Sequence, residues 1–197
     1  MWDTLSQNEL ANISFTSKIT KVRLNPQHIF VATKDKIFIY LLDGIEFLEK
    51  LEVDNHLGRI VLSPQPSMNP YLMYSNSLRD GQIAVFDLSL QKHVNIIKCH
   101  KTPVLKMAIS AYGNMVATCS TQGSMIRVYS IPQGENLYTF TRGIKNTTQY
   151  SLSFSNDSSF LLSSSNTGTI HLFQLYKHAN GHHSILKGDG NTSNVDD

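Results

Sequence analysis

Short apolar segments recur along the chain at a nearly constant spacing. Their first residues are 46, 43 and 44 positions apart, and a polar turn precedes each of them. In the last three units this turn ends in Gly81, Gly123 or Gly168. Because glycine takes a positive φ without steric cost, we expect these glycines to adopt one in hairpins. The recurring segments are residues 37–40, 83–86, 126–129 and 170–173.

Each unit contains further segments that are typical of β-strands. They are rich in Val, Ile, Tyr and Phe, and turn residues such as Asn-Pro and Ser-Pro separate them. No helical period of useful length competes with this pattern. One strand precedes each turn (29–32, 71–74, 115–118 and 160–163), another opens each unit (21–24, 59–62, 105–109 and 150–154), and a fourth closes three units (47–53, 94–99 and 137–140).

Four short strands per unit and a period in the low forties are typical of a WD-type β-propeller, in which each unit is one blade. We therefore predict an all-β chain with about four four-stranded blades in residues 1–177. Residues 178–197 are polar and are expected to form a flexible tail or loop. A chain of 197 residues is thus an unusually small propeller or part of a larger one. The units are expected at about 19–53, 57–100, 102–143 and 147–175.

Composition narrows the possible cellular settings. No apolar run approaches the roughly 18 to 20 residues of a membrane-spanning helix, and the first ten residues do not resemble a secretory signal. We therefore expect a cytosolic or nuclear compartment. Cys99 and Cys119 lack the spacing of a metal-binding or redox pair, so we predict two reduced, packed thiols.

The formal net charge of +2 conceals an uneven distribution. Residues 35–54 contain six acids and two lysines, whereas residues 92–145 contain seven basic residues and the single acid Glu135. The basic segment is either a solvated face or the binding surface for an anionic partner. Charge alone does not distinguish a phosphoinositide, a nucleic acid and an acidic protein, although the segment lacks the interleaved aromatic residues that stack on nucleic-acid bases.

Several motifs carry a resemblance to a known family. His-Lys-Thr-Pro occupies residues 100–103, Ile-Arg-Val-Tyr occupies 126–129, and Thr-Arg-Gly occupies 141–143. From about Trp2 to Leu175, the chain resembles the PROPPINs, seven-bladed propellers whose signature contains Arg-Arg-Gly. The resemblance implies that the four units correspond to blades three to six. It identifies the chain as a fragment, a truncated gene product or a degenerate paralogue.

The resemblance also implies two sites for phosphoinositide headgroups. In the family the two signature arginines serve separate sites, one on each side, which is physically sensible because adjacent strand residues point to opposite faces. Here Thr141 replaces the first arginine, and the loss of that charge puts the first site in doubt. The residues matching the first site are His100, Ser120, Thr121 and Arg127, and those matching the second are Arg142, Gly143, Ser164, Thr167 and His171.

These residues could also have purely structural roles. Arg142 could be a solvated residue at a strand end, His171 a structural histidine, and Arg127 an ordinary outward residue of a half-buried strand. His182 and His183 make only a weak metal site without further ligands. The chain has no Gly-x-x-x-x-Gly-Lys phosphate loop and no Gly-x-Ser-x-Gly elbow, so we expect no enzymatic activity, no cofactor and no bound metal.

The expected function follows from the resemblance. It implies a peripheral membrane adaptor that binds phosphatidylinositol 3-phosphate or 3,5-bisphosphate in autophagy and in endosomal or vacuolar trafficking. Its partners would be phosphoinositide membranes and autophagy-related or trafficking proteins, with no nucleic acid and no transmembrane segment. It would be cytoplasmic and associate with autophagosomal precursor, endosomal or vacuolar membranes. The alternative is a WD-type protein-interaction scaffold, or a truncated paralogue that has lost lipid binding.

Overall fold

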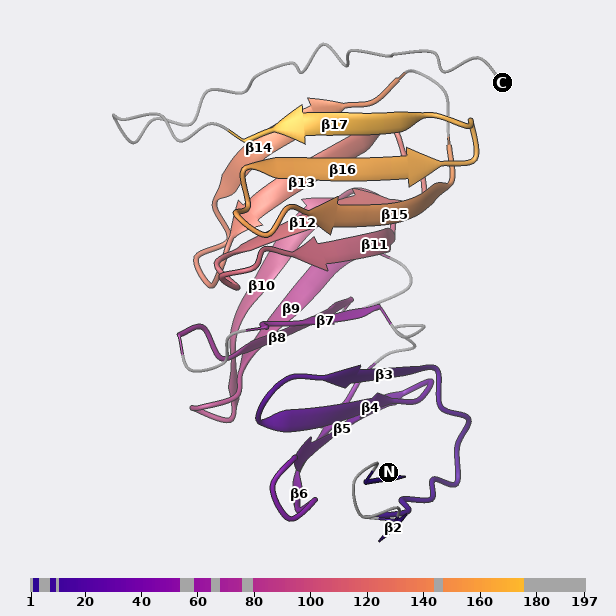
Figure 1. Cartoon of the computed structure of the whole chain (residues 1–197). Helices are drawn as coiled ribbons and strands as arrows, with labels where there is room; N and C mark the ends of the chain where they lie inside the picture. Colours follow the sequence, from indigo (N-terminus) through magenta and orange to yellow (C-terminus); the bar gives the residue numbers. More distant parts are fainter. Residues whose placement is uncertain are drawn as a thin grey trace.

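The computed structural model describes residues 2–3, 8–9, 11–53, 59–64, 68–75, 80–143 and 147–175. These residues form strands joined by turns, and four sheets follow one another along the chain (Figure 1). The predicted polar tail at 178–197, including His182 and His183, lies outside the described residues. No helix in the described part has the length and hydropathy needed to cross a membrane.

We call the four larger sheets blades one to four, in chain order. Two short strands, β1 (Trp2–Asp3) and β2 (Asn8–Glu9), pair with each other before blade one. Blade one contains β3 (Lys21–Leu24), β4 (His28–Ala32), β5 (Lys36–Leu41) and β6 (Phe47–Glu52). Blade two contains β7 (Ile60–Leu62), β8 (Tyr71–Ser75), β9 (Gly81–Asp87) and β10 (Lys92–His100). Blade three contains β11 (Val104–Ile109), β12 (Met115–Ser120), β13 (Met125–Ser130) and β14 (Asn136–Thr141). Blade four contains β15 (Gln149–Phe154), β16 (Phe160–Ser165) and β17 (Ile170–Gln174).

Every blade is an antiparallel meander in which neighbouring strands follow each other in the chain. The first strands of successive blades also touch, since β3 contacts β7, β7 contacts β11, and β11 contacts β15. They form the inner edge of the assembly, while later strands in each blade lie farther out. The predicted strand segments match the observed strands to within two residues at each end.

Apolar side chains between successive blades hold the sheets together. Phe30 and Ile39 of blade one pack with Leu72 and Phe86 of blade two. A second cluster joins blades two and three, and a third joins blades three and four. An inner blade is therefore buried on both faces, which explains why β9 and β12 carry apolar runs with little alternation. In the third cluster the rings of Phe140 and Phe173 stack at a centroid distance of 4.4 Å.

Two of the three turn glycines behave as the sequence predicts. Gly123 and Gly168 have φ values of 68° and 72°. The prediction was wrong for Gly81, whose φ is not positive. A Cβ at Gly81 would lie 2.3 Å from the carbonyl oxygen of His100, so this glycine is required by the close approach of β10.

Both cysteines are buried free thiols, which confirms the prediction of reduced, packed side chains. Cys99 lies in the cluster between blades two and three, and Cys119 in the cluster between blades three and four. Burial raises the pKa of each thiol to about 12. Both groups are therefore protonated at neutral pH and poor nucleophiles.

Candidate functional site

Arg142 follows β14 directly, and its guanidinium lies among side-chain hydroxyls from blade four and the segment before it. Nη1 donates a hydrogen bond to Oγ1 of Thr147, and Nη2 donates to Oγ of Ser165. Nη2 also lies 2.7 Å from Oγ1 of Thr167 and 3.0 Å from Oγ1 of Thr169. We call these four residues the hydroxyl cluster. They fix the position of the guanidinium at the junction of blades three and four.

The direction of Arg142 follows from strand alternation. Phe140 is buried in the cluster between blades three and four, and Thr141 beside it is exposed and pairs with Met125 of β13. The backbone N–H of Arg142 donates to the carbonyl of Ser124 at 2.9 Å, which continues the pairing beyond the strand. Arg142 therefore points to the same side as Phe140, toward blade four.

The hydroxyls near Arg142 form a continuous hydrogen-bonded chain. Oγ of Ser165 lies 2.9 Å from Oγ1 of Thr167, which lies 2.8 Å from Oγ1 of Thr169. Oγ1 of Thr169 in turn lies 3.3 Å from Nε2 of His171. A hydroxyl that accepts from a guanidinium still has a proton to donate, so this chain can present donors to an anion.

Among the described residues, the positive charge of the site has no acidic partner. Within the described part of the chain, no carboxylate forms a salt bridge with Arg142, and its Nε is buried without a hydrogen-bond partner. Burial lowers the pKa of Arg142, but a guanidinium remains charged at neutral pH. Burial and then the charge of Arg142 lower the pKa of His171, which is therefore mostly neutral at pH 7. A bound anion would favour protonation of His171, which would add a second positive charge.

The structure brings only part of the predicted second site together. Thr167 lies against Arg142, and His171 lies next in the same hydrogen-bonded chain. Ser164 does not join them, because its Oγ lies 2.8 Å from Oγ of Ser151, while the neighbouring Ser165 is the residue that meets Arg142. Gly143 is exposed, and a Cβ there would meet no atom within 4 Å.

Sequence analysis missed Thr147, Ser165 and Thr169. The alternation of Ser165, Thr167, Thr169 and His171 was a usable signal, since every second residue carries a polar side chain. Thr147 gave no such signal, because it lies outside the strands and reaches Arg142 only through the junction of the blades.

Residues of the predicted first site lie where blades two and three meet. Nη1 of Arg127 donates to the carbonyl of Cys99, and Nη2 lies 3.8 Å from the sulfur of Met125. Nε2 of His100 lies 3.0 Å from Oγ1 of Thr118, the residue that pairs with Arg127. Burial, followed by the charge of Arg127, lowers the pKa of His100 to about 4. His100 therefore offers a neutral hydrogen-bonding group at pH 7.

The other residues of the predicted first site differ in solvent exposure. Ser120 is buried, whereas Thr121 is exposed at the end of β12. Thr141 and Met125 are paired neighbours on the same face of blade three as Arg127. Thr141 and Arg142 thus point to opposite sides of this blade.

The described residues contain no evident metal centre. Among the described residues, no three His, Cys, Asp or Glu side chains gather closely enough to hold an ion. The only candidate motif from the sequence, His182 with His183, falls outside these residues.

Comparison with known proteins identifies the family. The sequence matches the family model described as PROPPIN over residues 3–185. This chain belongs to the PROPPIN family. It is 39% identical over 171 residues to WD repeat domain phosphoinositide-interacting protein 1 of Homo sapiens, and 37% identical over 175 residues to Autophagy-related protein 18 of Caenorhabditis elegans. These alignments cover 85% and 87% of the PROPPIN chain, but 38% and 42% of the two relatives.

Solved structures agree with the propeller architecture. Hsv2 of Kluyveromyces lactis matches with a TM-score of 0.80 and 27% identity, over 96% of this PROPPIN chain and 59% of that one. The predicted fold class is therefore confirmed: the blades form an incomplete β-propeller. The chain spans about two fifths of the length of the two curated relatives, and the matched solved structure is likewise longer.

Proposed function

We propose that this PROPPIN binds a phosphoinositide headgroup at Arg142. The observation that carries the proposal is the guanidinium held by the hydroxyl cluster, with no carboxylate partner among the described residues. A phosphate group would accept charge-assisted hydrogen bonds from the guanidinium and further hydrogen bonds from the hydroxyls. The site includes Thr147, Ser165 and Thr169, with His171 at its edge.

The names of relatives support the class of ligand and the process. One relative is named for interaction with phosphoinositides and another for autophagy. The chain would act as a non-enzymatic peripheral adaptor that recruits autophagy-related or trafficking proteins to membranes with phosphatidylinositol 3-phosphate or 3,5-bisphosphate. Such membranes include autophagosomal precursors, endosomes and the vacuole. Binding would be driven by headgroup charge and weakened by salt.

The substitution Arg142→Ala tests this site. It removes the charged donor while leaving the backbone hydrogen bond to Ser124 possible. A hydrogen bond to a charged group contributes about 1.5 kcal/mol or more, so liposome affinity should fall about tenfold. Sedimentation with liposomes containing phosphatidylinositol 3-phosphate measures the change. Lys98→Ala, which removes an exposed charge on β10, is the matched control and should remain close to the unmodified protein. Unchanged sedimentation of Arg142→Ala would rule out the site.

The substitution Thr141→Arg tests whether the opposite face can serve as a second site. The guanidinium of the introduced arginine would lie on the face of blade three that carries Arg127, where His100 offers a neutral imidazole at pH 7. We expect affinity for the same liposomes to increase about threefold to tenfold. Thr141→Gln, which adds length without charge, should have little effect. Equal affinities of the arginine variant and the unmodified protein would contradict the two-site arrangement.

One observation favours the scaffold alternative. Tyr150, Ile170 and Leu172 of blade four are 59%, 63% and 57% exposed, and large exposed apolar side chains are typical of protein-binding surfaces. A scaffold would capture partner proteins in pulldowns whether or not phosphoinositide is present. If Arg142→Ala leaves liposome binding unchanged but Leu172→Asp abolishes partner capture, the scaffold function is the correct one.

A further inference from the structure

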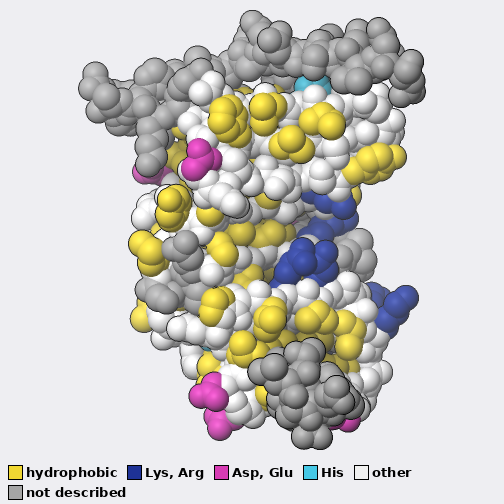
Figure 2. Space-filling view, viewed as in Figure 1, with side chains coloured by type: hydrophobic (Ala, Val, Ile, Leu, Met, Phe, Trp, Pro, Cys, Tyr) yellow, Lys and Arg dark blue, Asp and Glu magenta, His cyan; other side chains and the backbone are white. Residues whose placement is uncertain are grey.

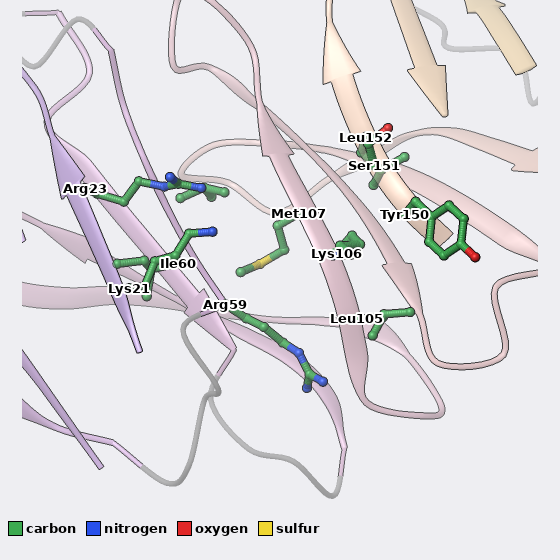
Figure 3. A pocket seen from close by; sticks show the side chains of 11 residues that line it. Lys21, Arg23, Arg59, Ile60, Leu105, Lys106, Met107, Tyr150, Ser151 and Leu152 are labelled. Carbon is green, nitrogen blue, oxygen red and sulfur yellow. The ribbon is translucent and has the colours of Figure 1, made fainter. Parts of the chain in front are cut away.

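The inner strands of the four blades line a cavity of about 470 Å³. Side chains from β3, β11 and β15 and from the start of β7 form its wall. Figure 3 shows side chains from these separate elements around one space. The volume lies in the range of roughly 300 to 1,000 Å³ that is typical of small-molecule sites. The cavity shares no lining residue with the hydroxyl cluster at Arg142.

Four of the residues lining this cavity are cationic, and none is acidic. Lys21 and Arg23 come from blade one, Arg59 directly precedes β7, and Lys106 lies on β11. In Figure 2, the Lys and Arg side chains visible on this face gather in the middle of the molecule, away from the Asp and Glu side chains. In the described ranges, no carboxylate forms a salt bridge with any of the four. The described residues thus concentrate positive charge here without a carboxylate beside it.

Lys21 and Arg59 are partly buried, whereas Arg23 and Lys106 are exposed. Nη1 of Arg59 is buried and has no hydrogen-bond partner among the described residues. Burial lowers the pKa of Lys21, and the charges of Arg23 and Lys106 lower it further. A buried charge without a partner is unfavourable, and a bound anion would relieve this cost. The charged side chains that line the cavity are therefore all hydrogen-bond donors, and none of them can accept a hydrogen bond.

We propose that this cavity binds a small, soluble polyphosphate anion. Several phosphate groups are needed to contact cations from both blade one and β11, which a single phosphate cannot do as effectively. Ile60, Leu105 and Met107 form apolar parts of the wall, and apolar surroundings strengthen the interaction between charges. This site is separate from the proposed headgroup site, and it would bind its ligand away from a membrane.

Isothermal titration calorimetry of the full chain at about 0.15 M ionic strength tests the proposal. The probes are inositol hexakisphosphate, tripolyphosphate and orthophosphate. We expect both polyphosphates to bind, and orthophosphate to bind at least ten times more weakly. The variants Arg59→Gln and Lys106→Gln should each weaken polyphosphate binding at least fivefold. Lys98→Gln should stay within twofold of the unmodified protein, since Lys98 is exposed on β10 and does not line the cavity.

Separate control experiments address the folding of the variants and their binding to lipid. The thermal unfolding midpoint is measured for each variant, and Lys106→Gln, at an exposed position on β11, carries the test if Arg59→Gln unfolds. Absence of polyphosphate binding, or equal weakening by Lys98→Gln and Lys106→Gln, would overturn the proposal. Liposome sedimentation distinguishes the two sources of phosphate. Arg59→Gln should retain phosphoinositide-dependent sedimentation, and a parallel loss of liposome and polyphosphate binding would identify the ligand as a lipid headgroup instead.

Discussion

Replacing Gly123 with alanine is expected to lower the free energy of unfolding by about 3 kcal/mol or more. Gly123 has a φ of 68°, and a Cβ added there would lie 1.7 Å from the carbonyl oxygen of Thr147. The left-handed conformation costs an ordinary residue about 1 to 2 kcal/mol, and overpacking adds about 1 to 3 kcal/mol. The clash cannot be relieved by rotating a side chain, because the obstructing atom belongs to the backbone.

The position of Gly123 also couples stability to the proposed headgroup site. Thr147, whose carbonyl would be displaced, belongs to the hydroxyl cluster and accepts a hydrogen bond from Arg142. Gln149 at the start of β15 also donates to the carbonyl of Gly123 at 3.1 Å. The Gly123→Ala variant should therefore lose liposome affinity even under conditions in which it remains folded.

Gly168 provides a matched control for this prediction. It ends the equivalent turn of blade four and has a φ of 72°, but a Cβ there would meet no atom within 4 Å. Gly168→Ala should cost only the conformational term, about 1 to 2 kcal/mol. Urea denaturation followed by circular dichroism measures both variants. Equal destabilisation of the two would show that the contact with Thr147 is unimportant.

The strands were predictable because two local signals coincide in each unit. Apolar β-formers such as Ile126 and Val128 mark a strand, and a turn ending in glycine marks its start, so the spacing alone locates the blades. Gly81 is a position where the local signals are insufficient. It occupies the same position in the repeat as Gly123, but glycine is needed there because the backbone of His100 on the next strand leaves no room for a Cβ. A local pattern contains no information about such a contact.

The candidate site was predictable in part for a related reason. Arg142 is assigned to a face by the buried Phe140 two residues earlier. In β16 no such guide exists, since Phe160, Leu161 and Leu162 are all apolar and the next three residues are all serines. The choice between Ser164 and Ser165 therefore depends on how blade four packs against blade three. The structure places Ser165 against Arg142, and Ser164 against Ser151 on the other face.

Acid sensitivity is the second large effect that we expect, and it comes from His100. The pKa of this side chain falls from its ordinary value of 6.5 to about 4 in the folded protein, first because of burial and then because of Arg127. Between these two values, the unfolded chain binds more protons at this residue than the folded chain does. The contribution of neutral His100 to stability is therefore complete above about pH 6.5, and it is lost as the pH falls toward 4.

The size of this loss can be measured by difference. At about 1.4 kcal/mol per pKa unit, His100 should account for about 3 kcal/mol between pH 7 and pH 4. The variant His100→Gln cannot titrate and can still hydrogen-bond to Thr118, so its free energy of unfolding should fall less over this interval. Urea denaturation at several pH values gives both curves. Parallel curves would show that His100 is not held neutral in the fold.

Other titratable groups leave this comparison interpretable. Hydrogen bonds from Ser155 and Ser159 lower the pKa of the exposed Asp157 to about 2, so its contribution changes mainly below the window in which His100 titrates. His171 also has a lowered pKa, but it retains its response in both proteins and cancels in the difference. His171→Gln is therefore the comparison variant, and it should reduce the fall in stability less than His100→Gln does. Because His100 is neutral at pH 7, the positive charge on this face of blade three comes from Arg127. The substitution Thr141→Arg would add a second positive charge to the same face.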